Sequence, residues 1–215
     1  MGLQDQLDEQ KRSTINKASP ETLQLMAQAT ADLKASGIEN RALGTGDKAP
    51  DFTLPNARGV PVTLKALLQD GPLVINIYRG GWCPYCNLEL RALTGIHPQI
   101  EALGARLLGI APEVPNKVAE TTQRHTAPFE ILSDVGNRVS RQFGLVFTLS
   151  ESIREIYSGF GIDLPAYNGD DHFELPLPAT YIVKSDGEIA YSFVDADYTR
   201  RMEPEAILDA LRKLA

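Results

Sequence analysis

The sequence predicts an α/β fold in which a central mixed sheet is flanked by helices, with a helical extension at the N-terminus. Three observations lead to this prediction. Between residues 73 and 143, apolar runs of strand length alternate with helix-like patterns, as in parallel strands joined by right-handed crossovers. Two further strand-like runs flank Ser185-Asp186-Gly187, which favours an antiparallel hairpin near the C-terminus. The first 43 residues are polar and follow a helical pattern.

Residues 1–43 are expected to form a helical hairpin that packs on the domain or on a second copy of the chain in a homodimer. Ser19 as N-cap and Pro20 at the first helical position predict the start of its second helix. No catalytic residue is expected in this segment. A stretch rich in glycine, proline and aspartate, residues 44–59, leads into a domain expected to span residues 44–215.

Within this domain, residues 73–78 form a nearly continuous apolar run, which is typical of a strand buried on both faces. A helix is expected to follow from about Pro84. Because Gly95 and Pro98 fall inside that helix, a kink is expected near His97. The remaining elements are expected to be strands at 106–110, 129–132, 180–184 and 188–194, helices at 116–125, 135–143 and 204–213, and an irregular stretch at 145–178.

The composition restricts the classes of partner. Of the 215 residues 43% are hydrophobic and 23% are charged, as in a soluble globular protein. The formal net charge of -7 argues against nucleic acid and against an anionic membrane, so small molecules and other proteins remain. No apolar run reaches the roughly 18 residues of a membrane span, and residues 4–12 lack the apolar core of a signal peptide. The expected location is therefore cytoplasmic.

The two cysteines of the chain, Cys83 and Cys86, lie where the buried strand ends and the next helix begins. Unpaired N–H groups and the helix dipole favour a thiolate there, and a cysteine in such a motif has a pKa of about 3.5–7.5 instead of about 8.5. Residues three apart on a helix are close enough for a small adjustment to join the sulfurs. The pair is therefore expected to cycle between a dithiol and a redox-active disulfide. Trp82, the only tryptophan, is expected to cover it.

Other interpretations of the cysteine pair explain less. Two inert core cysteines would not account for their position beside Gly80-Gly81-Trp82 at a strand-to-helix junction. Structural zinc usually takes four ligands, but the chain has no second cysteine pair and its three histidines show no ligand spacing. No metal and no other cofactor is expected.

Four further segments carry a resemblance to a known family: residues 49–54 (Ala-Pro-Asp-Phe-Thr-Leu), 59–64 (Gly-Val-Pro-Val-Thr-Leu), 129–134 (Phe-Glu-Ile-Leu-Ser-Asp) and 177–183 (Leu-Pro-Ala-Thr-Tyr-Ile-Val). With the cysteine motif, they resemble the peroxiredoxin-like branch of the alkyl hydroperoxide reductase and thiol-specific antioxidant group, within the thioredoxin-fold superfamily. The resemblance covers about residues 44–215. It implies a thioredoxin-like fold and a thiol-dependent peroxidase, which reduces hydrogen peroxide or organic hydroperoxides and is itself reduced by thioredoxin or another dithiol.

The resemblance leaves open which cysteine attacks first. Peroxiredoxins usually show Pro-x-x-x-Thr-x-x-Cys with a Glu three residues later, which makes Cys86 the attacking residue and Glu89 the Glu. In that register Cys83 replaces the Thr and Arg79 replaces the Pro. The distant arginine of the family would fall near Pro178. The thioredoxin register instead makes Cys83 the attacking thiol, Cys86 the resolving thiol and Pro178 a cis-proline that faces them. Arg79, Glu89 and Pro178 are accordingly expected to line the site with the tryptophan.

Three alternatives remain open at this point. The chain could be a thioredoxin-like oxidoreductase that acts on protein disulfides, or a non-enzymatic binding protein with unreactive cysteines. The tetrapeptide at residues 83–86 equals that of glutaredoxins, which raises glutathione as a partner, although no Gly-Gly follows the last hairpin. Residues 195–201 are expected to form a solvated loop, with a site-lining role for Arg201 as the alternative.

Overall fold

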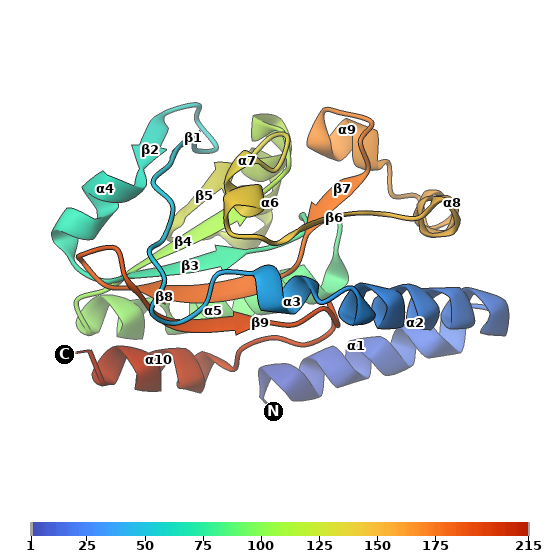
Figure 1. Cartoon of the computed structure of the whole chain (residues 1–215), viewed down its shortest axis with the longest axis horizontal. Coiled ribbons are helices and arrows are strands. Elements are labelled where there is room, and N and C mark those ends of the chain that lie inside the picture. Colours follow the sequence, from blue (N-terminus) through green and yellow to red (C-terminus); the bar gives the residue numbers. More distant parts are fainter. Residues whose placement is uncertain (1, 215) are drawn as a thin grey trace.

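A five-stranded mixed sheet lies at the centre of the structure, a computed structural model that describes residues 2–214 (Figure 1). The strand order is β5-β4-β3-β8-β9. Strands β3, β4 and β5 are parallel, whereas β8 runs antiparallel to both of its neighbours. The bounds are β3 Leu73–Ile77, β4 Arg106–Ala111, β5 Glu130–Ser133, β8 Ala179–Val183 and β9 Ile189–Val194. The predicted mixed sheet with its C-terminal hairpin is confirmed.

The register of the central strand determines which loops meet at one edge of the sheet. At the end of β3, Ile77 pairs with Ile110 of β4 on one side and with Ala179 of β8 on the other. The segments that follow β3 and β4 and the segment that precedes β8 therefore come together. Because ligands bind beside the carboxyl ends of strands in open α/β sheets, and both cysteines follow β3, this edge holds the candidate site.

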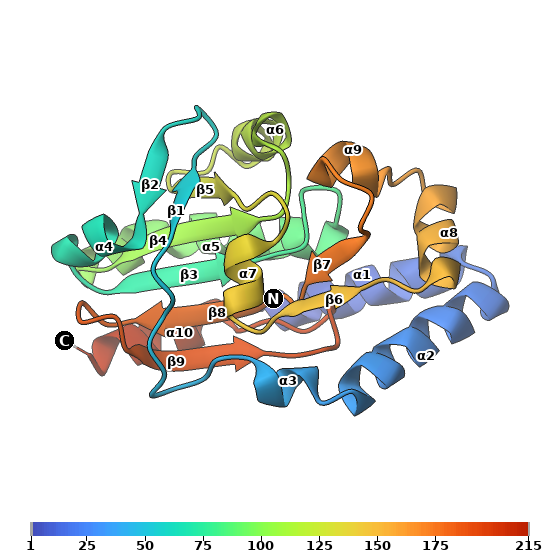
Figure 2. The same cartoon turned by 45° about the horizontal axis from the view of Figure 1, so that its top comes forward.

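Helices cover both faces of the sheet, as Figure 2 shows. Helix α5 (Pro84–Ala102) lies on one face with α10 (Pro204–Arg212), and α7 (Arg138–Gln142) lies on the other. Helix α6 (Pro115–His125) packs beside β5. Alternate residues of β3 enter two apolar clusters: Val74 packs in the α5 cluster, and Ile75 packs in the opposite one. Both faces of β3 are therefore buried, which explains its continuous apolar sequence.

The first two helices run in opposite directions along one side of the molecule and diverge from the turn that joins them (Figure 2). Helix α1 (Leu3–Lys17) packs on α5, and its side chains Leu3 and Leu7 are buried. Helix α2 (Pro20–Ala35) has no fully buried residue and contacts α8 (Glu151–Gly159). As predicted, Ser19 caps α2, because its Oγ accepts a hydrogen bond from the N–H of Thr22 at 3.1 Å. The division into an extension and a domain at residue 44 stays a prediction.

The stretch from 145 to 178 is not irregular, so that expectation is wrong. It contains β6 (Val146–Thr148), α8, α9 (Leu164–Asn168) and β7 (Glu174–Pro176). Strands β6 and β7 pair with each other, with Val146 opposite Pro176. Strands β6 and β7 are short and their pairing joins residues about 30 positions apart in the sequence, so no local periodicity predicts these two strands.

The remaining short elements complete the fold. Helix α5 continues as one helix through Pro98, and the kink expected near His97 stays a prediction. The other elements are α3 Ile38–Arg41, β1 Thr53–Pro55, β2 Pro61–Thr63, α4 Leu64–Leu67 and the 3-10 turn Leu68–Asp70. Among the described residues, no helix combines the length and the apolar character that crossing a bilayer requires.

Candidate active site

The loop between β3 and α5 places both cysteines at the start of a helix. Cys83 is the N-cap of α5 and Cys86 lies in its first turn. Both are free thiols, and only 1% of Cys83 and 0% of Cys86 is exposed. The two glycines before them allow the loop to pack closely. A Cβ on Gly80, whose φ is +146°, would lie 2.3 Å from Trp82 Nε1, and one on Gly81 would lie 2.0 Å from a Thr121 oxygen of α6.

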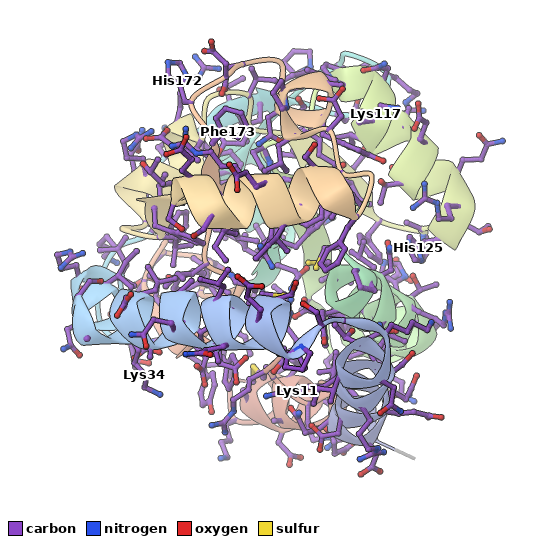
Figure 3. The ribbon with its side chains drawn as sticks, turned by 90° about the vertical axis from the view of Figure 1, so that its right-hand side faces the viewer. Lys11, Lys34, Lys117, His125, His172 and Phe173 are labelled. Carbon is purple, nitrogen blue, oxygen red and sulfur yellow. The ribbon has the colours of Figure 1, made fainter. Side chains whose placement is uncertain are left out.

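Both backbone polar groups of Gly81 form hydrogen bonds with side chains. Its N–H donates to a carboxylate oxygen of Glu113 at 2.9 Å. Its carbonyl accepts from the side chains of Asn87 at 2.9 Å and Arg124 at 2.8 Å. Asn87 in turn bonds to His125, which Figure 3 labels on α6. These contacts fix the backbone immediately before the tryptophan and the first cysteine.

The two thiols have opposite pKa shifts. Burial raises the pKa of Cys83, but a hydrogen bond from Cys86 and the charges of Arg79 and Arg201 outweigh it and lower the pKa to about 6. Burial raises the pKa of Cys86 well above its ordinary value, and its hydrogen bond to Cys83 adds to that effect. The hydrogen bond from Cys86 and the two cations thus favour the thiolate form of Cys83 over that of Cys86.

A buried ion pair adjoins Cys86. Arg201 Nε donates to Glu89 Oε2 at 2.6 Å, and Arg201 Nη2 lies 3.4 Å from the Cys86 sulfur. Only 1% of the Arg201 side chain and 2% of the Glu89 side chain are exposed. The other Glu89 oxygen accepts from Asn76 Nδ2 of β3 at 2.9 Å. Burial raises the pKa of Glu89 to about 7, and Arg201 acts in the opposite direction.

The expectation of a solvated loop at residues 195–201 is wrong for Arg201. Its guanidinium is buried and also donates to the carbonyl oxygens of Tyr198 and Arg200. Nothing in its spacing reveals this, because 115 residues separate it from Cys86. Arg201 thus places a buried cation beside Cys86, whereas position 178, near which the family resemblance places an arginine, holds an uncharged proline.

A second buried cation, Arg79, is enclosed by aromatic rings. Its guanidinium carbon lies 5.1 Å from the ring centre of Trp82, 5.4 Å from that of Tyr157 and 4.5 Å from that of Tyr198. It also donates to the Tyr157 hydroxyl, while its Nε has no partner among the described residues. Its charge is one of those that stabilise the Cys83 thiolate.

Glu113 is a buried acid that the sequence analysis missed. It lies two residues beyond the end of β4, and burial raises its pKa to about 7. One of its carboxylate oxygens anchors Gly81, and the other has no hydrogen-bond partner among residues 2–214. A signal was present, because a charged residue directly after a buried parallel strand lies at the edge where ligands bind.

The structure brings the expected site residues to one region with one correction. Arg79, Trp82 and Glu89 surround the cysteine turn, as described above. Pro178 lines an apolar pocket together with Arg79. The peptide bond before Pro178 is trans, so the expected cis-proline is wrong. In the described part of the chain, no three His, Cys, Asp or Glu side chains are grouped so that they could hold a metal ion.

The ionisation of Cys83 is directly measurable. In the reduced protein we expect a rise in far-ultraviolet thiolate absorbance with a midpoint at a pH of about 6. Cys83→Ser should lack this step. Cys86→Ala should shift it to higher pH, because the thiolate loses its hydrogen-bond donor. A first ionisation near the ordinary thiol value of about 8.5 would contradict the assignment.

Comparisons with known proteins agree on one family. Residues 45–192 match the model of the AhpC/TSA family. The protein bcp of Haemophilus influenzae, named as a peroxiredoxin, is 31% identical over 103 residues, which are 48% of this chain and 66% of its own length. The chloroplastic peroxiredoxin Q of Sedum lineare is 25% identical over 169 residues, which are 79% of this chain and 76% of its own.

A solved structure extends the comparison to the fold. Peroxidoxin BcpB from Mycobacterium tuberculosis superposes with a TM-score of 0.64 at 22% identity, over 80% of this chain and 99% of that one. This likeness confirms the expected thioredoxin-like fold. The chain spans about two thirds of the length of bcp. Helices α1 and α2 precede residue 45, where the family match begins.

Proposed function

The chain belongs to the AhpC/TSA family, and on that premise we propose that it is a thiol-dependent peroxidase. In this proposal Cys83 and Cys86 cycle between a dithiol and a disulfide. The observation that carries the proposal is the position of the cysteine pair at the start of α5, together with the buried cations Arg79 and Arg201. These cations and the hydrogen bond from Cys86 lower the pKa of Cys83, whereas burial raises the pKa of Cys86.

The first step is attack by the Cys83 thiolate on the terminal oxygen of a hydroperoxide. The S–O bond forms as the O–O bond breaks, and the alkoxide or hydroxide that leaves takes up a proton. Cys83 is then a sulfenic acid. The Cys86 sulfur attacks this sulfenic sulfur, so that an S–S bond forms, the S–O bond breaks and water leaves. An external dithiol, thioredoxin or another, reduces the disulfide by exchange and is itself oxidised.

The surrounding charges support this order of attack. Arg79 and Arg201 are buried beside the cysteine pair and stabilise negative charge on Cys83. The same cations can stabilise the charge that develops on the leaving oxygen, because a low-dielectric site strengthens such interactions. In the alternative register Cys86 attacks, with Glu89 and Arg201 beside it. The raised pKa of Cys86 weighs against that alternative.

A peroxide suits the site better than a protein disulfide. The two sulfurs are almost completely buried, so a small substrate reaches them with less rearrangement than a folded protein needs. The trans bond before Pro178 also removes one reason for a thioredoxin-like reaction. The proposed setting is the cytoplasm, with no nucleic acid or membrane as partner. A homodimer is proposed as the assembly, with the N-terminal helices available for contact.

The proposal predicts catalytic consumption of peroxide. With a thioredoxin system or dithiothreitol, the purified protein should remove hydrogen peroxide and cumene hydroperoxide over many turnovers. After one equivalent of peroxide without reductant, mass spectrometry should find one intramolecular disulfide between Cys83 and Cys86. The Cys83→Ser/Cys86→Ser double variant is the control. Peroxide loss no faster than with that variant would reject the function, and insulin reduction above the uncatalysed rate would favour the protein-disulfide alternative.

A further inference from the structure

We propose that the pocket between α2 and α8 binds the carbon chain of a neutral organic hydroperoxide, and that α2 thereby sets a preference for such substrates over hydrogen peroxide. This inference rests on the proposed peroxidase function. It assigns a role in substrate selection to a helix that lies outside the segment matched by the family.

The pocket is a cavity of about 250 Å³. Figure 3 shows its two helical sides, with α8 (pale orange) lying alongside α2 (blue) and side chains between them. Most of the lining side chains are apolar: Met26, Ala29 and Leu33 from α2, Ile153 and Tyr157 from α8, Phe147 and Leu149 from the segment before α8, and Leu177 and Pro178 from the segment before β8. A cavity of about 150 Å³ with such walls holds benzene. A substituent of that size therefore fits.

The pocket reaches Arg79, whose guanidinium packs 5.1 Å from the ring centre of Trp82, the residue before Cys83. Arg79 and Tyr198 belong to its lining, and the Arg79 guanidinium packs against the Tyr198 ring. The same guanidinium is one of the cations that lower the pKa of Cys83. A molecule with its carbon chain in the pocket therefore presents its polar end toward Arg79 and the cysteine pair. Hydrogen peroxide has no carbon chain and gains nothing from these walls.

The charges of the lining indicate an uncharged carbon chain. Arg79 is the only cation among the lining residues, and its guanidinium is already enclosed by three rings and the Tyr157 hydroxyl. The one carboxylate of the lining, Asp32, comes from α2. An anionic group on the carbon chain of the substrate would find no free cation in this lining. The occupant is therefore a neutral hydroperoxide with an apolar substituent, such as cumene hydroperoxide.

Ala29 offers a selective way to fill the pocket. Ala29→Phe places a ring into the cavity from α2 without touching the cysteine turn. Ala31→Phe is the matched control, because Ala31 is exposed on the same helix and does not line the pocket. Ala29→Phe should raise the KM for cumene hydroperoxide about tenfold, the scale at which a hydrophobic pocket discriminates by size. It should leave kcat/KM for hydrogen peroxide within about twofold, and Ala31→Phe should change neither.

Binding can be followed without turnover. Trp82 is the only tryptophan of the chain, and its ring lies 5.5 Å from that of Tyr157 in the pocket wall. The alcohol product of cumene hydroperoxide, 2-phenyl-2-propanol, should change Trp82 fluorescence with a saturable response. Ala29→Phe should weaken that response and Ala31→Phe should keep it. Circular dichroism and thermal unfolding of both variants establish that they fold.

The outcomes separate the inference from the function on which it rests. If Ala29→Phe lowers activity with both peroxides equally, or with neither, α2 does not select the substrate and the inference is wrong. If the wild-type protein consumes neither peroxide, the proposed function fails. The titration with 2-phenyl-2-propanol then still decides the pocket, because a response that is absent, or unchanged in Ala29→Phe, overturns it.

Discussion

Cys83→Ser is expected to abolish peroxide turnover, with a loss of at least about 10³-fold, because the attacking sulfur is gone. Cys86→Ser is expected to lose turnover with a thioredoxin system but to keep the first oxidation. The reason is that the pKa of Cys83 is lowered and that of Cys86 is raised, which favours Cys83 as the attacking thiolate. The measurement is oxidation by one equivalent of hydrogen peroxide, followed by trapping of the sulfenic acid with dimedone and location of the adduct by mass spectrometry.

The two single variants serve as controls for each other. A dimedone adduct at Cys83 in Cys86→Ser, with none at Cys86 in Cys83→Ser, supports the order of attack proposed above. The reverse pattern would establish the register in which Cys86 and Glu89 match the peroxiredoxin motif. In that case the buried Arg201, 3.4 Å from the Cys86 sulfur, would be the cation that activates the attacking residue.

Arg201→Met is expected to lower the free energy of unfolding by about 3–5 kcal/mol, the usual cost of removing one partner of a buried ion pair. The variant leaves the Glu89 carboxylate without its cation at a site where only 2% of its side chain is exposed. The double variant Arg201→Met/Glu89→Gln should recover most of the loss, because the remaining amide is neutral. Urea unfolding measures all three proteins. Arg200→Met is the matched control, since the neighbouring Arg200 side chain is 59% exposed.

The decrease in the free energy of unfolding caused by Arg201→Met should depend on pH. Without its cation, Glu89 has a folded-state pKa raised by burial above its ordinary value of 4.5, so the folded state binds more protons than the unfolded state. With Arg201 present the pKa of Glu89 is about 7, and without Arg201 it is higher, so the stability that the variant loses relative to wild type grows as the pH rises above about 7. Equal losses at about pH 5 and about pH 8 would show that Glu89 does not carry the effect.

The sequence predicts the centre of this fold well because its signals there are local. The apolar run at 73–78 and the Asp-Gly turn at 185–187 identify β3 and the hairpin of β8 and β9. Ser19 and Pro20 locate the start of α2. The prediction of an irregular stretch at 145–178 was wrong because β6 and β7 are only three residues long. Each is paired with the other, and helices α8 and α9 separate them in the sequence.

By itself, the sequence determined the strand–loop–helix position of Cys83 and Cys86 and the thioredoxin-like sheet around them. Both follow from residue types and spacings within short windows. Only the tertiary structure decided which charges surround the sulfurs. Glu89 and Arg201 are 112 residues apart, and α2 comes from outside the family segment to line the pocket above Arg79. Spacing along the chain does not encode such contacts. The pKa of each thiol depends on the sum of burial, hydrogen bonds and nearby charges, which exists only once distant parts of the chain have packed together.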